Sequence, residues 1–161
     1  MEDEQRQCRC CFTGHRPEKL TEPEDVIRVK LRAAIQEAIA DGYTEFITGM
    51  ARGVDIWAAE VVLGFKANDE NIKLICAIPF DGFERRWADE WRARYNAVKE
   101  AADEVVYVSR HYYSGCFQVR NEWMVDHSHR LIAVYNGEAG GTRNTITYAK
   151  RNSHQIIVVS E

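Results

Sequence analysis

Strand-like and helix-like segments alternate along the whole sequence, and this alternation constrains the fold more than any other feature. Short apolar runs are each followed by a longer segment with an apolar residue every three or four positions. Parallel strands need crossover connections of that length. The pattern therefore predicts an α/β protein of the Rossmann-like kind, with a mostly parallel sheet of about six strands and helices on both faces.

The expected strands cover residues 7–12, 44–48, 72–78, 104–108, 131–135 and 155–159. A capping box of Thr21 and Glu24 is expected to open the first helix, and Asp41-Gly42 to end it. Its apolar face would consist of Ile27, Leu31, Ala34 and Ala38. A second helix is expected from about Gly53, with a face of Val54, Trp57, Ala58, Val61 and Phe65. Two later helices are expected over 116–128 and 142–151.

A third helix is expected from about Gly82, with an aromatic and apolar stripe along one side. The stripe consists of Phe83, Trp87, Trp91, Tyr95 and Val98. Such a spacing is typical of core packing, which we expect here. An aromatic shelf for a nucleobase is the alternative interpretation.

Length and charge limit the class of protein. The 161 residues suit one domain over 1–161, because cores usually divide only beyond roughly 250 residues. The net charge of -4 provides no global basic field for a phosphodiester backbone, so nucleic acid is not the expected partner. The first residues lack the layout of a secretory signal, and no apolar run approaches the roughly 20 residues that span a bilayer. We therefore expect a cytoplasmic protein without membrane association.

The five cysteines form no paired C-x-x-C motif; they are Cys8, Cys10, Cys11, Cys76 and Cys116. Most fall in or beside expected strands, where thiols act as small apolar groups. A metal site on the first three would need a fourth ligand that the sequence does not indicate, so no metal and no cofactor are expected.

Three loops after expected strands carry residues suited to binding an anion. Thr13-Gly14-His15-Arg16-Pro17 combines a tight turn with donors, and Arg16 is suited to a bidentate phosphate contact. In the segment 48–55, Gly49 and Gly53 lie at the two ends of a loop that includes Arg52. Asp55 would either contact a ribose hydroxyl or cap the following helix.

The third loop, residues 136–145, is the strongest candidate for a phosphate site. Gly140, Gly141 and Thr142 open a helix, where free N–H groups, a hydroxyl and the helix dipole converge on one anion. A plain connection between strand and helix is the alternative. Since the carboxyl ends of parallel strands meet at one edge of a sheet, we expect the three loops to line one cleft.

Taken together, the three motifs resemble the YpsA-type (DUF1273) family of the SLOG superfamily, over about Cys11 to Val159. The segment 48–55 is also similar to the glycine-rich loop of the DNA-processing protein DprA. The segment 120–142 is similar to the lonely-guy phosphoribohydrolases, in which an arginine and a glycine-rich loop hold a nucleotide. This resemblance implies a nucleotide contact for Arg120, expected to point into the cleft. It also implies that Gly140, Gly141 and Thr142 hold the nucleotide's phosphate.

Those hydrolases use a glutamate at the position that Thr145 occupies here, and we expect this side chain to face the ribose. A hydroxyl cannot replace a carboxylate in cleaving a ribosyl bond. The resemblance thus supports the ligand class more than the reaction. The expected ligand-binding residues are Thr13, Gly14, His15, Arg16, Gly49, Arg52, Gly53, Asp55, Arg120, Asn121, Glu138, Gly140, Gly141 and Thr142.

Three functions follow from these residues. The first is binding or sensing of a phosphate-bearing, nucleotide-derived small molecule such as an ADP-ribose-like compound or a nucleotide sugar. The second is hydrolysis of an N-glycosidic or phosphoester bond in that ligand, with His15, Asp55 or Glu138 as acid or base. The third is a DprA-like DNA-handling module. The sequence leaves open whether the ligand is turned over and whether the protein is a homo-oligomer.

Overall fold

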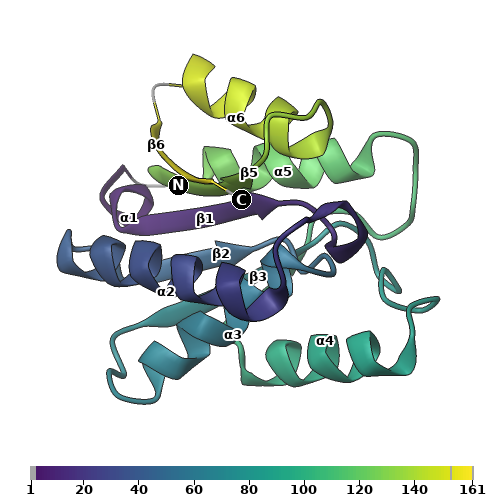
Figure 1. Cartoon of the computed structure of the whole chain (residues 1–161), viewed down its shortest axis with the longest axis horizontal. Coiled ribbons are helices and arrows are strands. Elements are labelled where there is room, and N and C mark those ends of the chain that lie inside the picture. Colours follow the sequence, from purple (N-terminus) through teal and green to yellow (C-terminus); the bar gives the residue numbers. More distant parts are fainter. Residues whose placement is uncertain (1–2, 153, 161) are drawn as a thin grey trace.

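A six-stranded, all-parallel sheet forms the centre of the protein (Figure 1). The computed structural model describes residues 3–152 and 154–160. In spatial order the strands are β4 (Glu104–Tyr107), β3 (Lys73–Ile78), β2 (Glu45–Thr48), β1 (Arg9–Gly14), β5 (Arg130–Tyr135) and β6 (Gln155–Ser160). The predicted α/β class and parallel sheet are confirmed.

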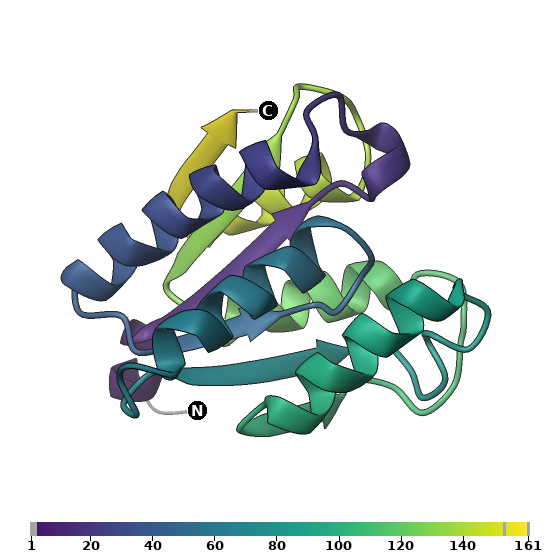
Figure 2. The same cartoon turned by 60° about the horizontal axis from the view of Figure 1, so that its bottom comes forward.

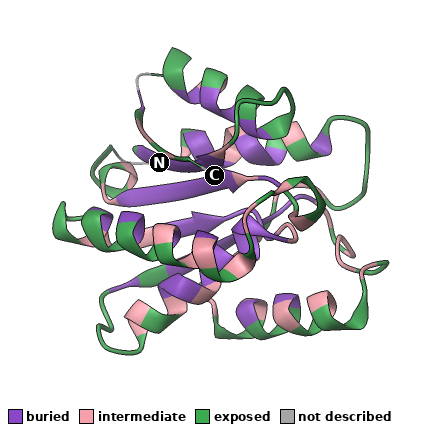
Figure 3. Cartoon of the chain, in the orientation of Figure 1, coloured by how far each residue is buried: buried purple, intermediate pink, exposed green. Residues whose placement is uncertain are grey.

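Helices cover both faces of the sheet, and each face has its own apolar core. One face carries α2 (Glu24–Ala40), α3 (Val54–Lys66) and α4 (Asp89–Ala101), which lie side by side in Figure 2. The other carries α5 (Cys116–Asp126) and α6 (Gly141–Arg151). Ile27, Leu31 and Trp57 belong to the first core, and Met124 and Ile146 to the second. Buried residues fill the four central strands and the inward sides of the helices (Figure 3), whereas the edge strands β4 and β6 are only partly buried.

The direction of strand addition reverses next to β1, and this reversal positions the site. Strands β1 to β4 follow one another toward one edge of the sheet, whereas β5 pairs with β1 on its opposite side, with Gly14 beside Val134. Helix α5 makes the connection between β4 and β5. In such sheets, ligands bind outside the carboxyl ends of the strands where the order reverses.

The start of α2 differs from the predicted capping box. The helix begins at Glu24, with Pro23 and not Thr21 as its N-cap residue. A capping box at Thr21 would require Glu22 to be helical, but a residue before proline is held in extended conformations. The apolar face and the end of the helix after Ala40 are as predicted.

The third predicted helix also begins later, at Asp89, so the aromatic stripe is divided. Tyr95 and Val98 are buried in the core, as expected. Phe83 and Trp87 instead lie on a series of turns before the helix and are only half-buried. A short helix α1 (Asp3–Gln7), which the sequence did not indicate, precedes β1.

All five cysteines are free, and four of them are buried. Burial raises the pKa of Cys11 and of Cys76 to about 12, which keeps both thiols protonated and unreactive near neutral pH. Within residues 3–152 and 154–160, no three His, Cys, Asp or Glu side chains gather closely enough to hold a metal ion. In the same part of the chain, no helix has the length and apolar character needed to cross a membrane.

Candidate functional site

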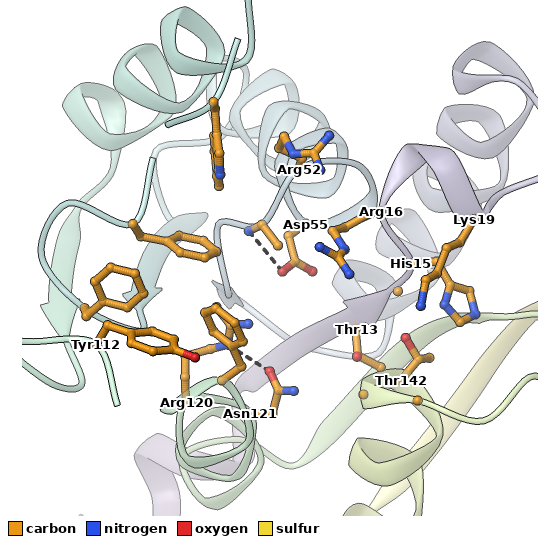
Figure 4. Close-up of a pocket in the computed structure, with 18 of the residues that line it drawn as sticks. Thr13, His15, Arg16, Lys19, Arg52, Asp55, Tyr112, Arg120, Asn121 and Thr142 are labelled. Atoms are coloured by element: carbon orange, nitrogen blue, oxygen red, sulfur yellow. Dashed lines mark hydrogen bonds between the residues drawn. The ribbon is translucent and has the colours of Figure 1, made fainter. Parts of the chain in front are cut away.

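A cavity of about 450 Å³ lies at the carboxyl ends of the strands, beside the reversal of strand order. All three anion-suited loops contribute to its wall, as predicted, and so do α5 and the connections after β3 and β4 (Figure 4). The lining residues are Thr13, Gly14, His15, Arg16, Lys19, Ala51, Arg52, Asp55, Phe80, Phe83, Trp87, Tyr112, Phe117, Arg120, Asn121, Ala139, Gly140, Gly141 and Thr142. Cavities of this size commonly hold small organic ligands.

Three of the predicted ligand-binding residues do not line the cavity. Glu138 is exposed, and its backbone N–H donates to Asn136 Oδ1 across a tight turn. Gly53 has a φ of 92° and lies so close to the first loop that a Cβ there would be 2.8 Å from the His15 carbonyl oxygen. Gly49 is buried, and a Cβ there would be 2.9 Å from Asp55 Oδ2 and 3.0 Å from Arg120 Cζ. The two glycines therefore serve close packing of the backbone.

His15 is held at one end of the cavity. It follows β1, is buried, and stacks on Tyr135 with ring centroids 6.4 Å apart. Its Nε2 atom is buried and has no hydrogen-bond partner. The β1 strand reaches so close to α3 that a Cβ on Gly14 would be 2.5 Å from the Val54 side chain, so glycine is required there. This close packing fixes the backbone from which His15 projects.

Asp55, in the first turn of α3, combines the two roles that the sequence left open. Its Oδ2 accepts a hydrogen bond from the Ala51 N–H at 3.2 Å, which closes the β2–α3 loop. Its Oδ1 is buried without a partner in the cavity wall. Burial raises the pKa of this carboxyl to about 6, against the opposing effect of the Arg120 charge and the Ala51 hydrogen bond. An unpaired buried oxygen of this kind is costly unless a ligand pairs with it.

Arg120 reaches the cavity from α5, as predicted, although only 5% of it is exposed. Its Nε donates to Asn121 Oδ1 at 2.8 Å and its Nη1 donates to the Gly49 carbonyl. The guanidinium also lies 5.8 Å from the centre of the Phe83 ring. Burial lowers the pKa of Arg120, while the Asp55 carboxylate opposes that shift. These contacts fix the guanidinium between the polar and aromatic parts of the wall.

Helix α6 begins at the cavity with Gly140, Gly141 and Thr142. The first N–H groups of a helix have no partner within it, and no side chain caps this helix. Asn121 lies opposite, since a Cβ on Gly141 would be 3.9 Å from its Nδ2. Backbone N–H groups, the Thr142 hydroxyl and an amide donor thus converge on one end of the cavity.

Thr145 does not face the cavity, which corrects the expectation that it would lie toward a ribose. Its side chain is fully buried, and its hydroxyl donates to the Gly141 carbonyl at 2.7 Å within α6. Because Glu138 is also absent from the wall, Asp55 is the one acidic side chain among the lining residues.

The opposite end of the cavity is aromatic, and the predicted site residues did not include it. Phe80, Phe83, Trp87, Tyr112 and Phe117 form a cluster with neighbouring ring centroids 5.0 to 6.3 Å apart. In Figure 4, Tyr112 lies far from His15 and Lys19. Phe80 and Tyr112 follow β3 and β4, so the rule that ligands bind at carboxyl ends of strands was the signal that could have identified them.

The cavity is basic although the protein as a whole is acidic. Four cationic side chains line it, namely Arg16, Lys19, Arg52 and Arg120, against the carboxylate of Asp55. Arg52 is paired with Glu18 at 2.7 Å. No ion pair engages the other three within the part of the chain that the structure describes. The local field therefore favours an anionic ligand.

Comparison with known proteins identifies the family. The YpsA model, which describes the YspA SLOG family, matches residues 10–158. The chain belongs to this family. The SPbeta prophage-derived protein YoqJ of Bacillus subtilis is similar, with 35% identity over 145 residues that cover 81% of this chain and 85% of YoqJ. The resemblance of the three sequence motifs to the YpsA-type SLOG proteins is confirmed.

Two solved structures share the fold of this chain. DNA processing protein A (DprA) from Streptococcus pneumoniae aligns with a TM-score of 0.68 at 16% identity, over 97% of this chain and 51% of that one. The Helicobacter pylori protein of the same name, described for its single-stranded DNA binding mode, gives a TM-score of 0.67 at 17% identity, over 96% and 66%. The chain thus spans about half the length of the S. pneumoniae protein.

Proposed function

We propose that the protein binds a phosphate-bearing, nucleotide-derived small molecule in the cavity described above. The observation that carries the proposal is the division of this cavity into an anion-receptive end and an aromatic end. A nucleotide has the same division, with a phosphate at one end and a planar base at the other.

The anion-receptive end is suited to a phosphate group. The start of α6 offers unpaired N–H groups and the positive end of the helix dipole, and Thr142 adds a hydroxyl. His15, Arg16 and Lys19 lie on the other side of the same end (Figure 4). Backbone and side-chain donors together would replace the water molecules around a phosphate. The backbone would not have to move for this.

The middle of the cavity is suited to a hydroxylated ring such as ribose. Asp55 Oδ1 is a buried acceptor without a donor, between the two ends of the cavity (Figure 4). A sugar hydroxyl is a donor of the right kind and would satisfy this oxygen. The aromatic end then offers Phe83 and Trp87 as stacking partners for a base.

Calorimetric titration with 5′-AMP, ribose 5-phosphate, adenosine and inorganic phosphate tests the proposal. We expect AMP to bind most tightly, because the other three compounds each fill only part of the cavity. Equal affinity for AMP and adenosine would show that the anion-receptive end does not bind the phosphate. Absence of AMP binding would overturn the proposal. Product analysis after long incubation would detect adenine if Asp55 supports hydrolysis.

The structural likeness to DprA bears on whether nucleic acid is a partner of this protein. The net charge argued against nucleic acid, but the H. pylori neighbour is described as binding single-stranded DNA, and the comparison does not support that exclusion. A single-stranded oligonucleotide therefore belongs in the same titration series. Tighter binding of a long oligonucleotide than of any mononucleotide, with strong dependence on salt, would favour the DNA-handling function.

A further inference from the structure

A second hollow adjoins the aromatic end of the cavity and shares its wall. It has a volume of about 440 Å³, and Phe80, Phe83, Trp87 and Tyr112 line both spaces. The shared rings place the second hollow on the side of the cavity away from His15 and Lys19, as the position of Tyr112 in Figure 4 shows. The second hollow therefore borders the proposed ligand site at its aromatic end.

Arg85 and Arg86 supply positive charge to this second hollow. Their backbone is held by consecutive turns, in which the Arg85 N–H donates to the Gly82 carbonyl at 3.0 Å and the Trp87 N–H donates to the Glu84 carbonyl at 3.0 Å. Gly82 has a φ of 88°, and a Cβ there would be 3.0 Å from Arg85 Nη2. The absence of a side chain at Gly82 thus makes room for the Arg85 guanidinium.

Neither arginine is paired with a carboxylate in residues 3–152 and 154–160. Asp81 lines the same hollow and Glu84 lies in the same turns, yet neither forms an ion pair with them. Arg94 on the neighbouring helix α4, in contrast, is paired with both Glu24 and Glu60. Two unpaired guanidinium groups beside an aromatic wall are suited to a phosphate, which arginine binds in a bidentate manner.

We propose that the second hollow binds a second phosphate of the same ligand. This inference rests on the proposed function. The ligand class is then a nucleotide whose ribose carries a second phosphate in addition to its 5′-phosphate. Both a nucleoside 3′,5′-bisphosphate and a dinucleotide with a 5′-phosphate have this chemistry.

Calorimetry with 5′-AMP, adenosine 3′,5′-bisphosphate and the dinucleotide pApA tests the second phosphate site. We expect at least one of the two larger ligands to bind about tenfold more tightly than AMP, the effect of one additional charge-assisted contact. In the double variant Arg85→Gln and Arg86→Gln this gain is lost, whereas the affinity for AMP is unchanged. The matched control is Arg92→Gln, an arginine of α4 that lines neither hollow and should preserve the gain.

The possible outcomes separate the two proposals. A gain for both larger ligands supports a site for any second phosphate, and a gain for pApA alone supports a site for a phosphodiester. If AMP binds but neither larger ligand binds more tightly, the second phosphate site is overturned and the proposed function stands. Persistence of the gain in the double variant also overturns it. If none of the three ligands binds, both proposals fail.

Discussion

Asp55 and Arg120 both lie against the side of Gly49 that a side chain would occupy, buried and oppositely charged, without forming a direct ion pair. A Cβ on Gly49 would be 2.9 Å from Asp55 Oδ2 and 3.0 Å from Arg120 Cζ. Each side chain is instead held by backbone, Asp55 by the Ala51 N–H and Arg120 by the Gly49 carbonyl. The absence of a side chain at Gly49 thus leaves the space that both groups occupy.

Gly49→Ala should destabilise the protein. Contacts below 3.0 Å are not tolerated, and both neighbours are buried side chains with fixed partners, so we expect a loss of about 1–3 kcal/mol in the free energy of unfolding. Urea denaturation measures it. The control is Gly64→Ala on the exposed side of α3, where nothing lies within 4 Å and alanine should stabilise by about 0.5–1 kcal/mol. Equal effects of the two substitutions would contradict the packing described at Gly49.

Asp55 should make stability depend on pH. Because burial raises its pKa from 3.8 to about 6, the fold favours the neutral carboxyl. The free energy of unfolding that this preference contributes is fully present below about pH 4 and is lost as the pH rises through about 6. Relative to the wild type, Asp55→Asn should therefore become more stable between these pH values, by up to about 3 kcal/mol.

Urea denaturation of the wild type and Asp55→Asn across that pH range measures the difference, and other titrating groups cancel because both proteins contain them. A difference independent of pH would show that Asp55 titrates normally. Saturation with AMP should reduce the difference, since a ribose hydroxyl donating to Oδ1 would stabilise the charged form.

Thr145→Glu should destabilise the fold rather than create a hydrolase. The position is fully buried and lies outside the cavity wall, so a carboxylate there would be buried without a partner, at a cost of about 3 kcal/mol or more. Thr147→Glu is the control, because Thr147 is exposed in the same helix and donates to the Arg143 carbonyl in the same way. A stable Thr145→Glu protein that releases adenine from AMP would contradict this structure of α6.

Gly141→Val should abolish AMP binding while preserving the fold. Gly141 is exposed, its φ is not positive, and the nearest atom to a Cβ would be Asn121 Nδ2 at 3.9 Å, so the protein has room for a side chain. That room is the space proposed for the phosphate. Calorimetry and thermal unfolding measure the two effects, with the exposed Asn144→Val in the same helix as the control. Binding of AMP at wild-type affinity would place the phosphate elsewhere.

Much of the fold could be predicted because the spacing of apolar residues within each strand or helix depends only on that segment of the sequence. Each of the six strands was located within two residues, and the buried face of α2 was predicted from Ile27, Leu31, Ala34 and Ala38. The helix starts two residues later than a capping box at Thr21 would place it, because Pro23 holds Glu22 in an extended conformation.

The site was harder to predict, for a different reason. Phe83 and Trp87 have the same spacing as residues of a buried helical face, and a stripe of aromatics does not reveal whether it meets a core or a cavity. The expectation for Thr145 failed because the hydroxyl forms a hydrogen bond within its own helix, an alternative that glutamate lacks. A resemblance in motif spacing predicts which residue occupies a given position. It does not predict which group the side chain of that residue contacts.

The two ends of the cavity belong to different connections of the fold, and this has a consequence for how such a protein diversifies. The anion-receptive end comes from the segments after β1 and β5, whereas most of the aromatic end comes from the segments after β3 and β4. Under the proposed function, mutations in residues 80–87 and 112–117 would change which ring the cavity accepts and leave the contacts of the anion-receptive end intact. One scaffold could in this way acquire different ligand preferences through changes confined to these two segments.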